Sequence, residues 1–281
     1  MSGSYWKQVV DHDFVVPQDR PLDDLTAELT RMLGSTDPAQ RDDTAYTALG
    51  TWTERGVYDD LLAGLGDGMA AGLTVGLGEK GTDSVFRRSF SVLILAECLA
   101  RDNVAALVPS AKVLEWGDRI ATWYLRERDL RGHVPGKGWA HAVAHGADAI
   151  GELARSPHLA TSELTVLLDV IGERLSLPVD ELFSHGEPDR MALATMHILR
   201  RNAVPLSVLE PWVARLVSIA TTKVRAGTDP FLLRGNAETY LRALYLQLAL
   251  APHPPGVRSD LLLCLVDALK RTNPHYLTAR G

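Results

Sequence analysis

The chain has 281 residues, of which 46% are hydrophobic and 23% are charged, and its formal net charge at pH 7 is -6. This hydrophobic fraction excludes an intrinsically disordered chain, because residues in this proportion can bury a sizeable core. The negative charge argues against a nucleic-acid-binding protein, which would gain its affinity from a basic face. We therefore expect a globular protein with no nucleic-acid partner.

No segment of the sequence has the pattern of a membrane or secretion signal. The opening residues MSGSYWK lead into polar residues rather than into an apolar core, and apolar stretches such as 92–96 and 261–266 are far shorter than the roughly 20 residues of a membrane span. The two cysteines, Cys98 and Cys264, lie in separate apolar helical patterns and form no CxxC pair, which favours reduced thiols. We expect a cytoplasmic protein that does not bind membranes.

Helical periodicity runs through nearly every segment, and no segment supports a β-sheet. Residues 1–20 form a lead-in, Pro21 opens a helix that ends at Gly34, and Asp37-Pro38 caps a helix that runs to about residue 55. Further helices are predicted at about 57–77, 82–101, 110–127, 138–156, 162–176, 188–202, 207–225, 235–250 and 257–271. Pro211 requires the helix at 207–225 to begin close to it or to bend there.

The predicted helices alternate in character. Those that open with turn or capping residues start near 37, 82, 138, 188 and 235, so their spacing of about 45–56 residues is near the length of a two-helix HEAT-type repeat. The helices between them are richer in leucine and valine, and each pair would bury its apolar stripe on its neighbours. We predict an all-α fold, a HEAT-like α-α superhelix of stacked antiparallel helix pairs, forming a single domain over 1–281 with a concave groove. An irregular all-α bundle is the alternative.

Three motifs carry a family resemblance: YDDLLAGLGDG at 58–68, FRRSF at 86–90 and GWAHAVAHGAD at 138–148. The segment RALYLQ at 242–247 and the Asn273-Pro274 ending add to it. Together they resemble an uncharacterised bacterial family, domain of unknown function 2785, over nearly the whole chain. The resemblance implies an all-helical, cytoplasmic protein, and it supplies no activity and no catalytic residues.

A glycine-rich loop precedes the helix predicted at 138–156. This loop, RGHVPGKG at 131–138, places Arg131 and Lys137 near the helix start. The backbone N–H groups and the dipole of a helix N-terminus favour a negative charge, and so does a nearby cation. The loop therefore predicts a site for a carboxylate, phosphate or sulfate group. The alternative is that the glycines only shape a turn while Lys137 points to water.

The same predicted helix carries a polar stripe, because His141, His145, Asp148 and Glu152 recur at helical spacing. A histidine oriented by a carboxylate can move a proton near neutral pH, so His141, His145 and Asp148 are candidate catalytic residues. Trp139 at the mouth of the stripe is a candidate ligand contact. The alternative is that the histidines hydrogen-bond across helices and the carboxylates face solvent. We expect neither a metal ion nor a cofactor, since no established ligand pattern accompanies the two histidines.

Two further features lie between residues 57 and 77. Glycines spaced four apart at 64, 68, 72 and 76 each cost a helix roughly 1 kcal/mol relative to alanine. Close approach of a neighbouring helix is the favoured explanation, and a ligand on the bare backbone or a helix broken near Asp67 are alternatives. Asp60, next to Asp59, is a candidate ligand-binding residue, although a solvated surface fits the spacing of these aspartates better.

Basic side chains from separate predicted helices complete the set of candidates. Arg41, Arg88 and Arg242 would line a locally positive groove if they converge. The alternative is that each pairs with a neighbouring carboxylate, such as Asp83 or Glu238.

Two functions fit these observations. In the first, which is favoured because no nucleophile–base pair or cofactor motif is present, a helical-repeat protein binds an anionic small molecule or a protein segment in its groove. In the second, the chain is an enzyme of specialised metabolism, a lyase, cyclase or hydrolase that acts on an anionic substrate by acid–base elimination, cyclisation or hydrolysis. His141 or His145 would move the proton and Asp148 would orient the histidine, while Lys137 and Arg88 would hold the negative charge.

Overall fold

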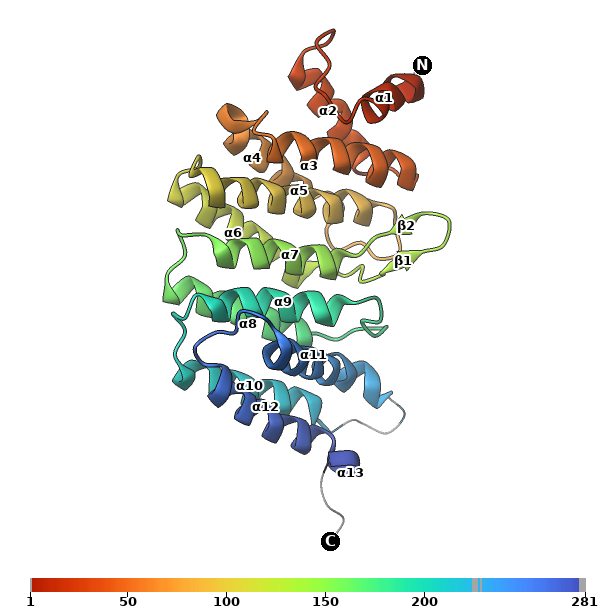
Figure 1. Cartoon of the computed structure of the whole chain (residues 1–281). Coiled ribbons are helices and arrows are strands. Elements are labelled where there is room, and N and C mark those ends of the chain that lie inside the picture. The colour runs from red at the N-terminus through yellow and green to blue at the C-terminus, as the bar shows by residue number, and fades with distance from the viewer. Residues whose placement is uncertain (1, 224–226, 228, 278–281) are drawn as a thin grey trace. The chain divides into compact units, whose positions relative to one another are not determined.

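The computed structural model of the chain describes residues 2–223, 227 and 229–277 (Figure 1). Its helices are α1 (Ser2–Asp11), α2 (Leu22–Met32), the π-helix η1 (Ala39–Tyr46), α3 (Thr47–Glu54), the 3-10 helix η2 (Asp59–Leu61), α4 (Leu62–Gly72), α5 (Ser84–Ala105), α6 (Ser110–Arg126), α7 (Ala142–Arg155), α8 (Thr161–Ser176), α9 (Glu187–Arg200), α10 (Leu206–Ala220), α11 (Pro230–Leu250), α12 (Arg258–Thr272) and α13 (Pro274–Leu277). Strands β1 (His133–Val134) and β2 (Gly138–Trp139) form a short antiparallel hairpin. The predicted all-α class is confirmed, with this hairpin as an addition that the periodicity did not indicate.

The chain divides into two compact units, Met1–Ala149 and Ile150–Gly281, and the boundary falls inside α7. Unit 1 contains the hairpin and nearly all of the candidate site residues. Unit 2 contains helices α8 to α13. A single superhelical domain with a shared concave groove stays a prediction.

Proline and aspartate mark several helix starts as predicted. Pro21 is the residue before α2, and the Asp37 carboxylate accepts a hydrogen bond from the Ala39 backbone N–H at 3.0 Å where η1 begins. Helix α10 begins at Leu206 and so contains Pro211 in its second turn. It ends at Ala220, which makes the predicted range of 207–225 too long, and the last two residues of that range lie outside the described residues.

The expected lead-in of residues 1–20 contains helix α1, which was not predicted. Its Trp6 side chain is buried, and the indole Nε1 donates a hydrogen bond to Glu28 Oε1 at 2.8 Å. Because Glu28 belongs to α2, this bond and the burial of Trp6 attach α1 to the first long helix of unit 1.

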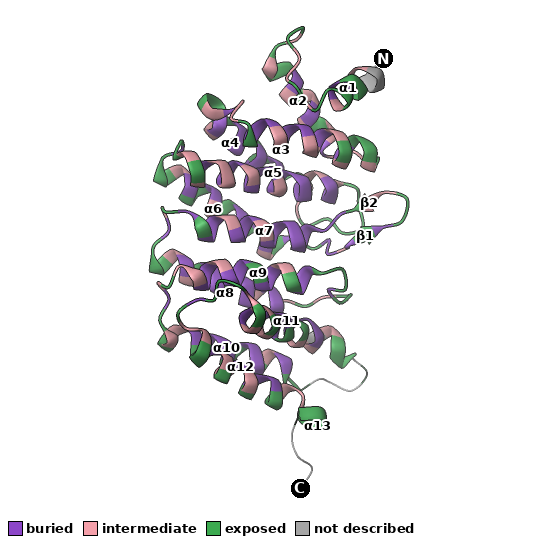
Figure 2. Ribbon diagram, viewed as in Figure 1, coloured by how far each residue is buried: buried purple, intermediate pink, exposed green. Residues whose placement is uncertain are grey.

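Helices α4 and α5 form an antiparallel pair in unit 1. Asp59, just before α4, forms an ion pair with Arg101 near the end of α5. Gly72, at the end of α4, lies against Ser91 in the first half of α5. Figure 2 shows buried residues along the length of α5, which packs against both α3 and α4.

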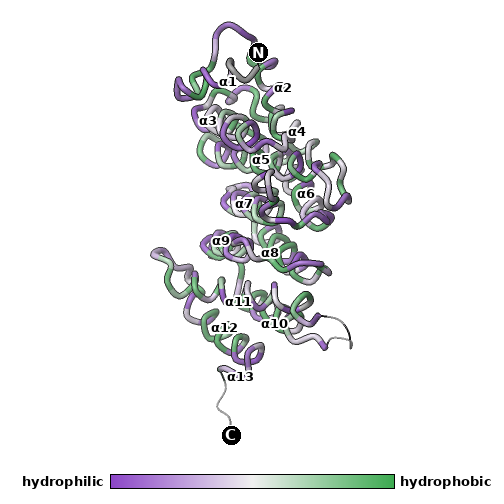
Figure 3. The backbone as a smooth tube through the Cα atoms, turned by 90° about the vertical axis from the view of Figure 1, so that its right-hand side faces the viewer, coloured by the Kyte–Doolittle hydropathy of each residue, from purple (hydrophilic) through white to green (hydrophobic). Residues whose placement is uncertain are grey.

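Helices α4 and α6 run in parallel. The Trp116 indole, in the first half of α6, donates to Asp67 in the middle of α4, and Ala70 near the end of α4 lines one pocket together with Trp123 near the end of α6. Figure 3, which views several helices nearly end-on, shows α4 and α6 in one layer of unit 1 and α3, α5 and α7 in the other. Antiparallel neighbours with parallel next neighbours are the arrangement of stacked helical hairpins.

A buried ion pair joins these two layers. Arg88 of α5 is completely buried, and its Nε and Nη2 atoms donate to the two carboxylate oxygens of Glu127 at 2.5 and 2.9 Å. The remaining nitrogen, Nη1, donates to the carbonyl oxygens of Val75 and Gly76 and to the hydroxyl of Ser84. Arg88 therefore connects the turn after α4 with α5 and with the end of α6.

The Glu127 side of the pair is also satisfied. Its carboxylate accepts from Trp123 Nε1 at 3.1 Å and from the backbone N–H groups of Arg128 and Asp129, both at 2.9 Å. Asp129 in turn accepts from the backbone N–H of Gly81. A buried charge is tolerated when its hydrogen-bonding capacity is filled in this way, so the pair fixes the start of the segment that leads to the hairpin.

Unit 2 has its own core. Helix α11 packs against α9, α10 and α12, and α8 packs against α9 and α10. The Trp212 indole of α10 donates to the Leu168 carbonyl of α8 at 2.9 Å, and the hydroxyls of Thr195 and Tyr240 lie 2.6 Å apart between α9 and α11. His197 of α9 is half-buried, and burial lowers the pKa of its imidazole.

The glycines at 64–76 are of two kinds. A Cβ atom at Gly66 would lie 2.1 Å from the Trp116 ring, and one at Gly72 would lie 2.2 Å from the Ser91 hydroxyl, so at both positions a neighbouring helix approaches closely. A Cβ atom at Gly64 or Gly68, in contrast, would have no atom of a neighbouring element within 4 Å. Positive φ angles at residues 76 and 78 belong to the turns that follow α4, which is why the helix predicted at 57–77 ends at residue 72.

These surroundings predict opposite effects of alanine at neighbouring glycines. Gly64→Ala and Gly68→Ala should each raise the free energy of unfolding by about 0.5–1 kcal/mol, because alanine favours the helix and meets no neighbour. Gly66→Ala should lower it by about 1–3 kcal/mol, because its methyl group overlaps a buried indole. Urea unfolding followed by circular dichroism measures all three variants. A Gly66→Ala variant as stable as Gly64→Ala would contradict the packing of Trp116 on α4.

Candidate functional site

The hairpin presents three aromatic side chains together. The Trp139 ring stacks on the His141 imidazole with centroids 4.5 Å apart and ring planes 19° apart, and the His133 ring meets Trp139 edge-on at 5.0 Å. Trp139 is 42% exposed, whereas His141 is 9% exposed. We call His133, Trp139 and His141 the hairpin site. All three belong to unit 1.

The helix that carries the polar stripe begins later than predicted. Gly136 and Gly138 have φ angles of 74° and 75°, a conformation that suits the turn of a hairpin and not a helix. His141 has a φ of 52°, and α7 begins only at Ala142. His141 is therefore not a helical residue. Its carbonyl oxygen accepts the hydrogen bond from the His145 backbone N–H at 2.9 Å at the start of α7.

His145 lies in the interior, 6% exposed. Its Nδ1 atom is 2.8 Å from the Ser89 hydroxyl oxygen, and that hydroxyl donates its proton to the Ala140 carbonyl. Since a serine has one hydroxyl proton, Nδ1 of His145 must be the donor toward Ser89. The ring also packs edge-on against Phe90 at 5.2 Å, and Asp148 is half-buried one turn further along α7. This geometry supports the alternative of histidines that bond between helices, while catalysis by His141, His145 and Asp148 stays a prediction.

The predicted anion site contains neutralised cations. Lys137 lies at the hairpin turn, and its Nζ contacts Asp83 Oδ1 at 2.6 Å. Arg131 donates to both carboxylate oxygens of Asp129 at 2.7 Å and also to the Thr82 carbonyl. The loop leads into β2 and not into a helix N-terminus, so the structure does not bring together the helix start and the cation that the prediction combined.

The other candidate residues are also engaged or lie elsewhere. Arg88 belongs to the buried pair with Glu127. Arg242, which lies in unit 2, pairs with Glu238 at 3.2 Å. Asp60 is exposed in η2, whereas the neighbouring Asp59 pairs with Arg101. The alternative that these arginines pair with carboxylates holds for Arg88, Arg242 and Arg41, whose Nη2 lies 2.9 Å from Asp42 Oδ2. Glu127 is a partner that the sequence did not indicate.

Arg41 anchors the hairpin and does not line an open groove, because its side chain is completely buried. Its guanidinium lies 4.3 and 4.8 Å from the ring centroids of Phe86 and Phe90, a cation–π arrangement. Nη2 donates to the Lys137 carbonyl at 2.8 Å, and Nη1 donates to the Ser35 carbonyl at 2.8 Å. The π-helix η1 supplies this side chain, so the hairpin turn is bonded to a distant part of unit 1.

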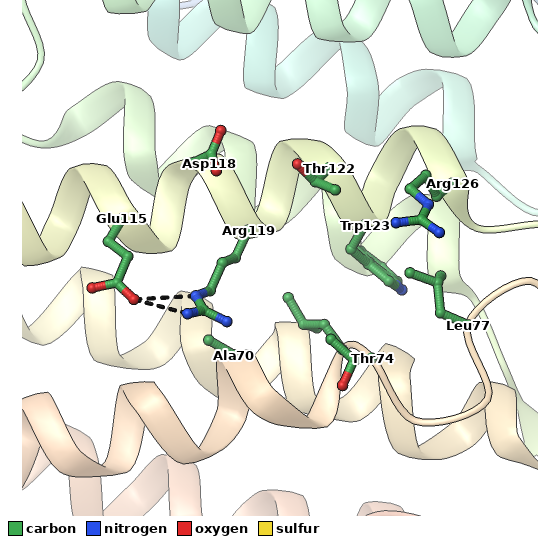
Figure 4. A pocket seen from close by; sticks show the side chains of 10 residues that line it. Ala70, Thr74, Leu77, Glu115, Asp118, Arg119, Thr122, Trp123 and Arg126 are labelled. Carbon is green, nitrogen blue, oxygen red and sulfur yellow. Dashed lines mark hydrogen bonds and ion pairs between the residues drawn. The ribbon is translucent and has the colours of Figure 1, made fainter.

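A pocket that the sequence did not indicate lies between α4 and α6 (Figure 4). Its volume is about 310 Å³, and its lining residues are Ala70, Leu73, Thr74, Leu77, Glu115, Asp118, Arg119, Thr122, Trp123 and Arg126. The residues from α6 recur every three or four positions and therefore share one face of that helix. This spacing was the available signal, but a charged helical face is more often solvated surface, so the sequence alone did not distinguish a pocket.

Unit 2 has a second pocket, of about 370 Å³, between α10 and α12. Two of its charged lining residues, Arg271 and Asp267, pair with each other at 3.7 Å. Cys264 lines the same pocket and has a free thiol, whose pKa is raised by burial and by the nearby Glu210.

Within residues 2–223, 227 and 229–277, no three His, Cys, Asp or Glu side chains gather as ligands of one metal ion. Over the same residues, no helix combines the length and the apolar character needed to cross a bilayer.

The chain matches one known protein family. The profile of the family described as "Protein of unknown function (DUF2785)" matches residues 73–246, more than half of the sequence, and the chain belongs to this family. The match includes the FRRSF and GWAHAVAHGAD motifs, so the resemblance seen in the sequence is confirmed. No curated protein and no solved structure matches the chain.

The surroundings of His145 predict a loss of stability when its ring is removed. His145→Ala should lower the free energy of unfolding by about 1–3 kcal/mol, because the Ser89 hydroxyl loses a buried partner and the ring leaves a cavity. His133→Ala, at an exposed position of the same site, should change it by less than about 0.5 kcal/mol. Urea unfolding of both variants provides the measurement. Equal stability of His145→Ala and wild type would instead favour the catalytic interpretation.

Proposed function

We propose that the protein is a binding protein and that the hairpin site contacts a segment of a partner protein. The observation that most supports this proposal is the partly exposed Trp139 ring, stacked on His141 at 4.5 Å and held on a hairpin. Tryptophan is enriched among the residues that dominate protein–protein binding energies, and it buries a large area at small conformational cost.

The hairpin site is held rigidly. Backbone hydrogen bonds from Ala140 to Gly132 and from His141 to Arg131, at 2.8 and 3.0 Å, extend the strand pairing beyond β1 and β2. Side-chain bonds from Arg41 and Ser89 fix the carbonyl oxygens at 137 and 140 from two other elements. A surface ordered before binding loses less conformational entropy when a partner docks, which favours recognition.

The charges around the site favour a protein segment over an anionic small molecule. Lys137 and Arg131 are each neutralised by an aspartate, so an anion would have to displace an existing ion pair. The accessible part of the site is aromatic, and interface cores are likewise rich in aromatic side chains and poor in unpaired charge. The enzyme alternative has less support, because His145 donates to Ser89 in the interior.

The proposal also covers the helical architecture of the protein and its location in the cell. The antiparallel α4–α5 pair and the parallel α4 and α6 support a HEAT-like stack of helical hairpins, in which a concave surface would extend the binding site. The free thiols of Cys98 and Cys264 support a reducing, cytoplasmic location.

A peptide library displayed on phage and selected on the intact chain tests the proposal. Enriched peptides should bind Trp139→Ala at least about tenfold more weakly than wild type, because truncation of a central tryptophan removes about 2 kcal/mol or more. Val104→Ala serves as the matched control, since Val104 is 80% exposed on α5 and lies outside the hairpin site. It should leave the Kd unchanged. Enriched peptides that bind Trp139→Ala as tightly as wild type would overturn the proposal, and so would the absence of any enrichment.

A further inference from the structure

We propose that the partner segment binds the hairpin site in an extended conformation and adds a third strand at the outer edge of β1. This inference rests on the proposed function and deepens it, because it states how the backbone of the partner is recognised. It follows from the strand register, from the backbone groups of His133 and from the contacts that occupy the edge of β2.

The hairpin alternates between a buried face and an exposed face. Val134 and Ala140 are buried, whereas His133 and Trp139 are exposed. Successive side chains of a strand point to opposite faces, and residues that are partners in the register share one face. His133 and Trp139 are such partners, so both side chains lie on the exposed face. A segment that pairs with β1 would continue this face beside them.

The backbone N–H and C=O groups of His133 point to the outer edge of β1. The Ala140 N–H donates to the Gly132 carbonyl at 2.8 Å, so the pair of His133 and Trp139 is one without hydrogen bonds between its own members. Within the part of the chain that the structure describes, neither backbone group of His133 has a hydrogen-bond partner. Unpaired groups at a sheet edge are those that the backbone of an extended segment satisfies.

The edge of β2, in contrast, is occupied by the chain itself. The Lys137 carbonyl accepts the hydrogen bond from Arg41 Nη2 at 2.8 Å. A Cβ atom at Gly138 would lie 3.2 Å from the Cβ atom of Pro38, so the residue that precedes η1 also lies against this strand. Of the two edges of the hairpin, the β1 edge is therefore the one that suits a partner.

The β1 edge is short, which favours a separate segment over a second copy of the chain. The strand has two residues, and Pro135, which follows them, has no N–H group to donate. Short edges and proline are devices that prevent two folded sheets from pairing edge to edge. A separate segment pairs at His133 and gains further contact area on the adjacent aromatic rings.

The register also indicates which side chain the segment presents. Its residue beside His133 on the exposed face contacts the imidazole, and the Trp139 ring lies on the other side of that imidazole at 5.0 Å. Aromatic and β-branched side chains form the favourable cross-strand pairs with an aromatic neighbour. We therefore expect an aromatic or β-branched residue at this position of the segment.

Backbone N-methylation of a peptide tests the inference. The peptide most enriched on the intact chain is synthesised with one N-methyl group at each position in turn, and each Kd is measured by isothermal titration calorimetry. Methylation of the residue that donates to the His133 carbonyl should weaken binding at least about fivefold, because one hydrogen bond is lost. Methylation of either residue next to it should leave the Kd unchanged, because those N–H groups face away from β1.

The outcomes separate this inference from the proposed function. A peptide that binds Trp139→Ala weakly but tolerates every N-methyl group would overturn strand addition and leave the proposed function standing. The absence of any enriched peptide would overturn both.

His133→Pro provides the complementary test on the protein. Proline removes the outward N–H of His133, and an edge strand tolerates proline where the N–H faces solvent. His133→Ala is the matched control, because it removes the imidazole and keeps the N–H. His133→Pro should bind the peptide at least about fivefold more weakly than His133→Ala.

Melting curves verify that both variants are folded, and the N-methylated peptides decide if His133→Pro is not. Equal Kd values for the two folded variants would overturn the proposal. Sedimentation of wild type as a dimer that His133→Pro dissociates would assign the edge to a second copy and would overturn it as well.

Discussion

The buried pair of Arg88 and Glu127 is the interaction on which the arrangement of unit 1 depends. Arg88, on α5, donates a hydrogen bond to the turn after α4. Glu127, at the end of α6, accepts hydrogen bonds from Arg88 and from the backbone that continues toward the hairpin. Removing one partner of such a pair leaves an uncompensated charge in the interior, which destabilises a fold by about 3–5 kcal/mol. The hairpin site depends on this pair as well, since the hairpin follows the segment that starts at Arg128.

The chemistry of the hairpin site follows from how its charged side chains are paired. At the hairpin site the cations are neutralised and the partly exposed surface is a tryptophan ring, a combination that suits a protein partner. Local charge pairing, and not the overall charge of the chain, therefore determines which kind of partner the site suits.

Much of the helical fold was predictable because apolar spacing and capping residues act locally. Pro21 and Asp37 marked helix starts, and Arg88 stands in register with Val85, Val92 and Leu95, so its burial could have been read from that core stripe. Its partner could not be predicted, because Glu127 follows 39 residues later in the sequence, after α6, and only the folded chain brings the two side chains together. The predicted start of α7 was wrong for a local reason. The glycines at 136 and 138 adopt left-handed backbone angles and form a hairpin instead of a first helical turn. The pairing of Lys137 and Arg131 with aspartates depended on how the loop folds, which the spacing of charges does not encode.

Amide hydrogen exchange of Glu127→Gln compared with wild type tests the role of the buried pair most directly. The backbone N–H groups of Arg128 and Asp129 bond to the Glu127 carboxylate, and that of Gly81 bonds to Asp129. Loss of the charge should accelerate exchange at these three amides by more than about tenfold, while the amides of α9 to α12 keep their wild-type rates. Unchanged exchange at residues 81, 128 and 129 would contradict the account.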